Sequence, residues 1–170
     1  DKTINELIKA CFDMGEVKTG ALIVIEQKNR LDEYIRTGIN IDAVLSSQLL
    51  INIFEHNTPL HDGAVVMRGN RIVAATCYLP LSDNMELSKQ LGTRHRAGVG
   101  ISEVTDSVTI IVSEETGQVS VARDGKLVRN VTSAQLRKIL ELAKNKTVID
   151  NNKLRQLLKG RTKNEGKNNK

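Results

Sequence analysis

The stretch "SVTIIVSEETGQVSVARDGKLVRNV" (residues 107–131) decides the fold. It contains three short runs rich in β-branched residues, separated by turn-forming segments at residues 115–117 (ETG) and 124–125 (DG). The stretch therefore predicts three consecutive strands joined by hairpin turns. A strictly alternating parallel fold has no place for such hairpins, so we expect a mixed sheet.

The residues at the start of the chain alternate between helical and strand patterns. Residues 3–14 carry apolar side chains at helical spacing, and residues 21–26 form a short β-branched run that predicts a buried strand. Residues 40–56 place several apolar side chains on one helical face, with Asp42 at a plausible cap position. These patterns predict helix, strand and helix in that order.

The remaining segments complete a helix-covered sheet. Two apolar runs within residues 63–79 are joined at residues 68–70 and predict a hairpin. Residues 84–104 return to a helical pattern in two pieces, with an interruption near Gly92, and residues 132–146 predict a capped amphipathic helix. The expected fold class is α/β, with a mixed sheet of one globular domain flanked by helices.

Length and composition favour one domain followed by a tail. A chain of 170 residues, 39% hydrophobic and 26% charged, is the size of a single core. We expect this domain to end at residue 145, with a basic, flexible tail over residues 146–170. No apolar window of about 18 residues is present and the chain starts without a signal-peptide pattern. We therefore expect a soluble fragment of a longer protein.

Charge and cysteine usage exclude two classes of function. Residues 159–170 hold five basic residues and one acidic residue, so they supply most of the net charge of +5. The body of the chain is nearly neutral and the whole chain has four aromatic residues, which argues against nucleic-acid binding. Cys11 and Cys77 lie far apart in apolar surroundings. We expect two buried, reduced thiols, and no disulfide or zinc site.

An acidic residue and a glycine precede the predicted hairpin. Asp62 and Gly63 follow a segment without strand character, so a simple hairpin turn explains them poorly. His61 and Asp62 together offer a nitrogen and an oxygen ligand, and Gly63 permits close approach of a ligand to the backbone. The alternative is an ordinary turn, as expected at residues 124–125.

The run Arg94-His95-Arg96 opens a predicted helix between two glycine-bearing segments. A helix N-terminus with Thr93 as its cap offers free amide groups, and arginine adds paired donors to phosphate oxygens. Small residues after the run keep the helix slim where it must approach another group closely. The alternative is a solvated basic surface, but the setting favours a phosphate site.

Two further segments have both an ordinary and a functional interpretation. The "SEET" segment (residues 113–116) ends a predicted strand, so its carboxylates form either an acidic turn or ligands of a divalent ion beside bound phosphates. Tyr78 precedes Leu79 and Pro80 at a strand end, where its ring either packs in the core or lies against a purine.

The motifs "DGA" (62–64), "GTRHRA" (92–97) and "SEET" (113–116), in this order and at this spacing, resemble the signature of diadenylate cyclase (DAC) domains. The resemblance covers about residues 5–145, and it is to the membrane-anchored CdaA type. It implies a mixed sheet of about seven strands and the condensation of two ATP molecules into cyclic di-AMP with release of two pyrophosphates. One departure is Gly98, where related sequences often carry a small aliphatic residue.

Carried over residue by residue, the resemblance implies three sets of site residues. The catalytic set is Asp62, Arg94, His95 and Arg96. The ATP-binding set is Gly63, Ala64, Tyr78, Leu79, Gly92, Thr93, Arg94, Ser113 and Glu114. The metal ligands, for Mn²⁺ or Mg²⁺, are Asp62, His61 and Glu115.

The resemblance also implies partners and a location. Joining two ATP molecules symmetrically requires a face-to-face homodimer, with one ATP in each subunit. The resemblance further implies an upstream transmembrane segment, a cytosolic catalytic domain at the bacterial plasma membrane, and possible regulatory proteins. The alternatives are a non-catalytic sensor of adenine nucleotides, which would use the same residues, and nucleic-acid binding by the basic tail, which the composition disfavours.

Overall fold

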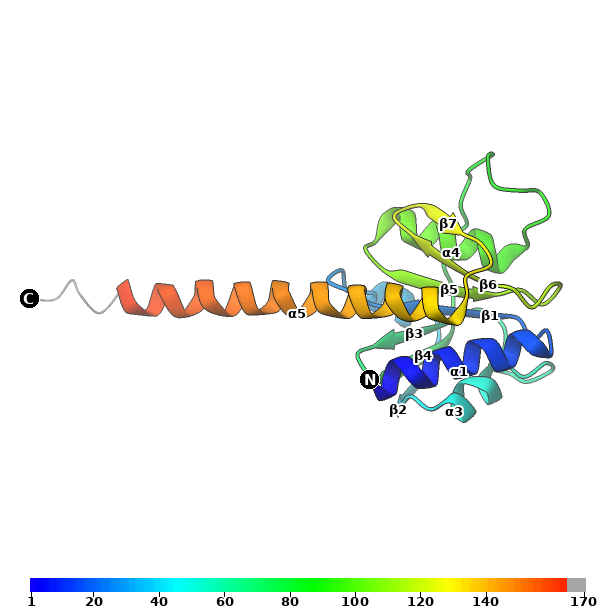
Figure 1. Ribbon diagram of the computed structural model, residues 1–170, viewed down its shortest axis with the longest axis horizontal. Helices are drawn as coiled ribbons and strands as arrows, with labels where there is room; N and C mark the ends of the chain where they lie inside the picture. Colours follow the sequence, from blue (N-terminus) through cyan, green and yellow to red (C-terminus); the bar gives the residue numbers. More distant parts are fainter. Residues whose placement is uncertain (165–170) are drawn as a thin grey trace, which may run out of the picture.

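The computed structural model describes residues 1–164, which form five helices and one sheet of seven strands (Figure 1). The helices are α1 (Lys2–Glu16), α2 (Asp32–Ile35), α3 (Ser47–Phe54), α4 (Thr93–Val104) and α5 (Ser133–Asn164). The strands are β1 (Ala21–Ile25), β2 (Ile39–Val44), β3 (Ala64–Arg68), β4 (Arg71–Cys77), β5 (Val108–Val112), β6 (Val119–Arg123) and β7 (Lys126–Val128).

One parallel pair makes the sheet mixed. The strand order is β2-β4-β3-β1-β5-β6-β7, in which β1 lies parallel to β3 and the other neighbours are antiparallel. The turns predicted at residues 68–70, 115–117 and 124–125 are the β3–β4, β5–β6 and β6–β7 connections. The predicted fold class and the three hairpins are therefore confirmed.

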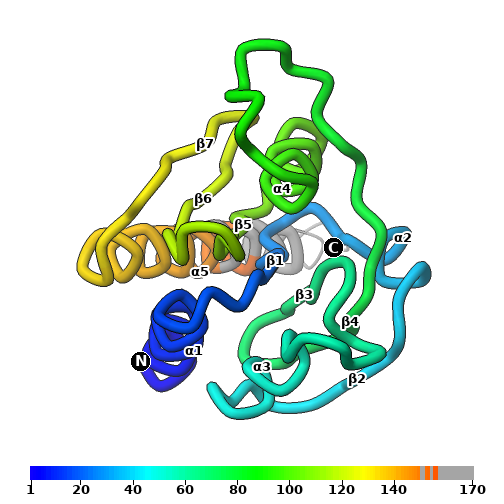
Figure 2. The backbone as a smooth tube through the Cα atoms, turned by 90° about the vertical axis from the view of Figure 1, so that its right-hand side faces the viewer, coloured from blue at the N-terminus to red at the C-terminus, as the bar shows by residue number. Residues whose placement is uncertain are grey.

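Different helices cover the two faces of the sheet, as Figure 2 shows for α1 and α4. Helices α1, α3 and α5 pack on one face, where β1 and β5 contribute Ile23 and Ile110. Helices α2 and α4 cover the other face, where the same strands contribute Leu22 and Ile111. Because the central strands are buried on both faces, they read in the sequence as continuous apolar runs.

The helix predicted over residues 40–56 is wrong in its first half. Ile39–Val44 forms the edge strand β2, and α3 begins after Ser46, whose hydroxyl accepts a hydrogen bond from the Leu49 amide at 3.1 Å. Asp42 therefore caps no helix; it lies in an irregular part of β2 with a φ of +47°. Serine at the N-cap satisfies an amide that the first turn leaves free, which fixes the start of α3.

Two other helix predictions need correction. Residues 84–91 are not helical, so α4 alone represents the predicted two-part helix of residues 84–104. The final helix begins as predicted, with Thr132 and Gln135 exchanging side-chain and amide hydrogen bonds in a capping box. It continues to Asn164, so residues 146–164 of the predicted tail are helical (Figure 1). Residues 165–170 of that tail lie outside the described residues.

Both cysteines are buried and unpaired, as predicted. Burial raises the pKa of the Cys11 thiol to about 12 and that of the Cys77 thiol to about 11, because a thiolate is poorly solvated in apolar surroundings. Among residues 1–164, no helix is long and apolar enough to cross a bilayer.

Candidate active site

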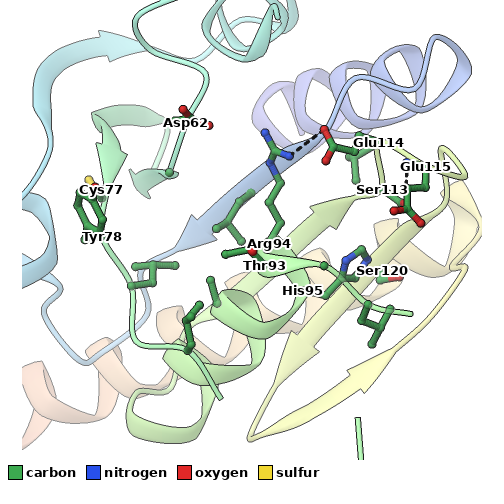
Figure 3. A pocket seen from close by; sticks show the side chains of 18 of the residues that line it. Asp62, Cys77, Tyr78, Thr93, Arg94, His95, Ser113, Glu114, Glu115 and Ser120 are labelled. Atoms are coloured by element: carbon green, nitrogen blue, oxygen red, sulfur yellow. Dashed lines mark hydrogen bonds and ion pairs between the residues drawn. The ribbon is translucent and has the colours of Figure 1, made fainter. Parts of the chain in front are cut away.

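A cavity of about 920 Å³ opens at the strand ends on one side of the sheet, where β4 and β5 end and β1 and β3 begin (Figure 3). The N-terminus of α4 and the turn after β5 form two of its walls. Of the predicted site residues, the lining includes Asp62, Gly63, Tyr78, Leu79, Gly92, Thr93, Arg94, His95, Ser113, Glu114 and Glu115. The sheet edge thus gathers three sequence motifs into one cavity.

The corner formed by Asp62 and Gly63 lies at the cavity wall beside β4. Gly63 has a φ of +83°, and a Cβ there would lie 2.9 Å from the Cys77 carbonyl oxygen. Glycine is therefore required here by the neighbouring strand as well as by any ligand. The Asp62 side chain is 90% exposed and lines the cavity. Ala64, predicted to contact ATP, is instead fully buried within β3 and does not line the cavity.

His61 stands behind Asp62 and outside the cavity lining. Its Nδ1 lies 2.6 Å from the Thr58 carbonyl oxygen, and a carbonyl only accepts, so Nδ1 carries the proton. In the neutral ring Nε2 is then unprotonated, and it lies 3.6 Å from Asp62 Oδ1. An imidazole nitrogen beside an exposed carboxylate suits a divalent ion such as Mn²⁺, so these two residues fit two of the three predicted metal ligands.

Glu115 does not join them. Figure 3 places Glu115 and Asp62 on different sides of the cavity, because Glu115 belongs to the turn after β5 whereas Asp62 precedes β3. In the part of the chain that the structure describes, no group of three His, Cys, Asp or Glu residues could hold a metal. The predicted three-residue metal site is therefore not preformed among the described residues.

The N-terminus of α4 lacks the predicted cap. Gly92 is the N-cap residue and no side chain bonds the first amides; Thr93 is the first helical residue, so its predicted capping role is wrong. The leading amides are consequently available to an anion, and Gly92 and Thr93 both line the cavity. The slim part of the helix, at Gly98 and Gly100, serves the protein's own packing, since a Cβ at Gly100 would lie 1.9 Å from the Pro80 carbonyl oxygen.

Arg94 enters the cavity and Arg96 does not. The Arg94 guanidinium forms an ion pair with Glu114 at 3.4 Å (Figure 3), while its buried Nε has no hydrogen-bond partner in the structure. Buried donors are rarely left unpaired, so this atom is open to an incoming acceptor. Gly20 makes room for the guanidinium: a Cβ there would lie 2.6 Å from Arg94 Nη1. Arg96 is absent from the cavity lining, being turned by about 200° from Arg94 around the helix.

His95 is 8% exposed and lines the cavity beside Arg94. Burial lowers its pKa, and the positive charges of Arg129 and Arg94 lower it further, against an opposing effect of Glu115. The imidazole is thus held neutral at neutral pH, with one N–H to donate. His95 can therefore donate a hydrogen bond without adding a positive charge to the cavity.

The "SEET" turn is held by its own serine. The Ser113 hydroxyl oxygen accepts the amides of Glu115 and Thr116, each at 3.2 Å, which leaves the hydroxyl hydrogen free to donate. Glu114 pairs with Arg94, so its carboxylate already has a partner in the cavity. The segment is therefore both an acidic turn and a wall of the site.

Tyr78 is 80% exposed at the opposite wall, so the interpretation as core packing is wrong. Its backbone amide donates to the Thr37 hydroxyl at 2.8 Å, which fixes the segment that follows β4. An exposed aromatic ring on a fixed backbone offers a flat surface to a heterocyclic base.

Several lining residues were missed from the sequence. Thr37, Thr76, Gln118, Ser120 and Arg129 carry no motif, and only the folded sheet edge brings them to the cavity. The missed arginine changes the charge of the site, because the lining holds two arginines against three carboxylates. With His95 neutral, the lining is net negative by one charge. The side chains of the lining therefore give an anionic ligand no net positive charge, and the uncapped N-terminus of α4 is the further source of positive potential.

Comparisons with known proteins identify the family of the chain. A family model described as "DisA bacterial checkpoint controller nucleotide-binding" matches residues 8–127. The chain is 54% identical over 160 residues to cyclic di-AMP synthase CdaA of Bacillus subtilis, which covers 94% of this chain and 59% of that protein. It is 56% identical over 137 residues to a diadenylate cyclase of Listeria monocytogenes, covering 81% of this chain and 50% of that protein.

Two solved structures have a fold similar to that of this chain. The crystal structure of a double mutant of DacA from Staphylococcus aureus aligns with a TM-score of 0.82 at 51% identity, covering 84% of this chain and 95% of that chain. A protein of Bacillus cereus described as a hypothetical membrane spanning protein aligns with a TM-score of 0.73 at 42% identity, covering 75% of this chain and 63% of that chain. The chain spans between half and three fifths of the length of the curated relatives above.

Proposed function

Since the chain belongs to the DisA bacterial checkpoint controller nucleotide-binding family, we propose that it is a diadenylate cyclase. The reaction joins two ATP molecules into cyclic di-AMP and releases two pyrophosphates. One observation carries the proposal: the Asp62 corner and the open N-terminus of α4, with Arg94, face the same cavity. Its volume of about 920 Å³ lies within the range of nucleotide-sized sites.

The chemistry consists of two substitution reactions, one at the α-phosphorus of each ATP. The 3′-hydroxyl oxygen of each ATP bonds to the α-phosphorus of the other, as the bond from that phosphorus to the departing pyrophosphate breaks. The hydroxyl proton passes to the Asp62 carboxylate or to water. Asp62 is suited to this role because its carboxylate is exposed in the cavity and makes no ion pair with an arginine or lysine among the described residues.

The α4 end of the cavity is the proposed phosphate site. The free amides of the first turn, the unpaired Arg94 Nε and the neutral His95 ring offer donors that strengthen as charge moves onto the leaving pyrophosphate. Ser113 adds its free hydroxyl hydrogen. At the other wall, the Tyr78 ring and the backbone near Leu79 are positioned for adenine.

The proposed cofactor is Mn²⁺ or Mg²⁺, held by Asp62 and His61 together with substrate oxygens. Such an ion would neutralise phosphate charge and orient the reacting oxygens. The net negative lining supports this requirement, because ATP brings further negative charge into a cavity with only two arginines.

The proposed active form is a symmetric dimer. One cavity of this size accommodates one ATP, while the ring product needs two nucleotides facing each other in opposite directions. Two copies of the chain meeting across a two-fold axis satisfy this geometry. We place the catalytic unit within residues 1–145, and propose that the whole protein is anchored to the bacterial plasma membrane upstream of it and is tuned by regulatory proteins.

The direct test is a product assay. Purified protein is incubated with ATP and Mn²⁺ or Mg²⁺, and cyclic di-AMP and pyrophosphate are separated by chromatography. We expect two pyrophosphates for each cyclic product, a rate that rises with the square of protein concentration when the protein is dilute, and no turnover by Asp62→Asn. Tight ATP binding without any product would refute the cyclase and support the alternative, a nucleotide sensor.

A further inference from the structure

We propose that Arg129, which lies outside every sequence motif, is a second phosphate-binding arginine that holds the pyrophosphate end of ATP. The inference deepens the proposed function and rests on it for the identity of the ligand. Arg129 lines the cavity from the segment between β7 and α5, far along the chain from Arg94.

The backbone fixes where Arg129 lies. In the β6–β7 pair, Val121 is opposite Val128, so Arg129 follows at the level of Ser120, another lining residue. The amide of Val131 donates to the Val119 carbonyl oxygen at 2.8 Å, which holds the segment against β6 just after β7 ends. Arg129 is therefore anchored at its backbone and exposed at its side chain.

Charge separates the two lining arginines. Arg94 is paired with Glu114, whereas no described residue forms a hydrogen bond or ion pair with the Arg129 side chain. The positive charge of Arg129 nonetheless contributes to the electrostatic potential inside the cavity, since it lowers the pKa of the buried His95. An arginine without a carboxylate partner, next to a neutral histidine and an open helix N-terminus, is suited to a multiply charged phosphate.

The position also assigns a direction to the substrate. Asp62 and Tyr78 lie away from His95 in Figure 3, whereas Ser120, the residue level with Arg129 in the β6–β7 pair, lies beside it. The 3′-hydroxyl and the adenine ring of ATP thus belong at the Asp62 side of the cavity, and the outer phosphates belong at the Arg129 side. Arg129 then contacts the pyrophosphate that leaves, and its contribution should depend on the length of the phosphate chain.

The test is a binding series by calorimetry on the whole chain, with Mg²⁺ present and with inorganic pyrophosphate, ATP and adenosine as probes. For Arg129→Gln we expect roughly tenfold weaker binding of pyrophosphate and ATP and unchanged binding of adenosine. Arg129→Lys should recover part of the loss. The matched control is Arg123→Gln on the same hairpin, whose guanidinium pairs with Asp124 outside the cavity and should not matter.

Two outcomes would overturn the inference: pyrophosphate bound by Arg129→Gln as tightly as by the unaltered protein, or a loss that is equal for adenosine and pyrophosphate. The second result would indicate a structural role. The decisive probes are pyrophosphate and adenosine, which the cyclase does not turn over, so the proposed function fails separately, through the absence of cyclic product from the unaltered protein.

Discussion

Gly20→Ala should lower the rate of the enzyme by displacing the Arg94 side chain, although residue 20 itself does not line the cavity. The Cβ of alanine would lie 2.6 Å from Arg94 Nη1 and 2.9 Å from its Cζ, whereas ordinary carbon contacts begin near 3.5 Å. The guanidinium must therefore move by about 1 Å, away from its place between Gly20 and Glu114. A displacement of about 1 Å in a catalytic group lowers rates by up to about 100-fold.

The assay measures the initial rate of cyclic di-AMP formation alongside the free energy of unfolding. We expect Gly20→Ala to lose about 10- to 100-fold in rate while unfolding changes by less than about 1 kcal/mol, because the flexible end of a side chain yields more easily than backbone. Gly69→Ala is the control: nothing lies near its Cβ, but its φ of +59° strains any alanine. That control should lose stability and keep its rate. A normal rate in Gly20→Ala would refute the claim that Arg94 must occupy this exact place.

Three further predictions concern packing, an ion pair and pH. Gly100→Ala should lower the free energy of unfolding by about 2–3 kcal/mol in urea titrations, because its Cβ would meet the Pro80 carbonyl oxygen and backbone must shift; an unchanged midpoint would contradict this. Glu26→Gln should lower the free energy of unfolding by about 2 kcal/mol, because the buried Glu26 carboxylate accepts two hydrogen bonds from Arg68. Thermal melts in which the variant matches the unaltered protein would refute this. In NMR titrations the pKa of His95 should lie below the usual histidine value of about 6.5. Below pH 6.5 the unfolded chain then binds the proton more readily than the folded chain, so the free energy of unfolding falls as the pH drops. A His95 pKa above 6.5 would count against the buried, neutral ring.

The sequence predicted the sheet better than its edge. Residues 107–131 have turns whose glycines leave few alternatives, and all three strands formed there. Residues 40–56 were harder, because an edge strand with one exposed face and a short helix after it present apolar residues at mixed spacing. Val44, one of the apolar residues in this segment, is 56% exposed on β2. The hydroxyl of Ser46 was the available signal for where the helix starts.

The motifs located the site, but they did not reveal its geometry. Helical periodicity alone could have shown that Arg94 and Arg96 point to different sides of α4. In contrast, Arg129 and Gly20 belong to no motif, and their place depends on strand pairing that brings distant segments to one edge of the sheet. The residues predicted as metal ligands divide in the same way: His61 and Asp62 are chain neighbours, whereas the place of Glu115 depends on tertiary structure that the sequence left open.

The cavity takes its walls from nearly the whole domain, beginning at Leu22 and ending at Arg129. Removing the strands at either end of the sheet removes part of the cavity wall, because Ile39 of β2 and Arg129 after β7 both line it. Nucleotide affinity and cooperative folding are consequently linked: a ligand that binds only the folded domain stabilises it by RT ln(1 + [L]/Kd), so the melting temperature keeps rising with ligand concentration after the site is saturated. Destabilising substitutions far from the cavity will therefore be partly rescued at high nucleotide concentration.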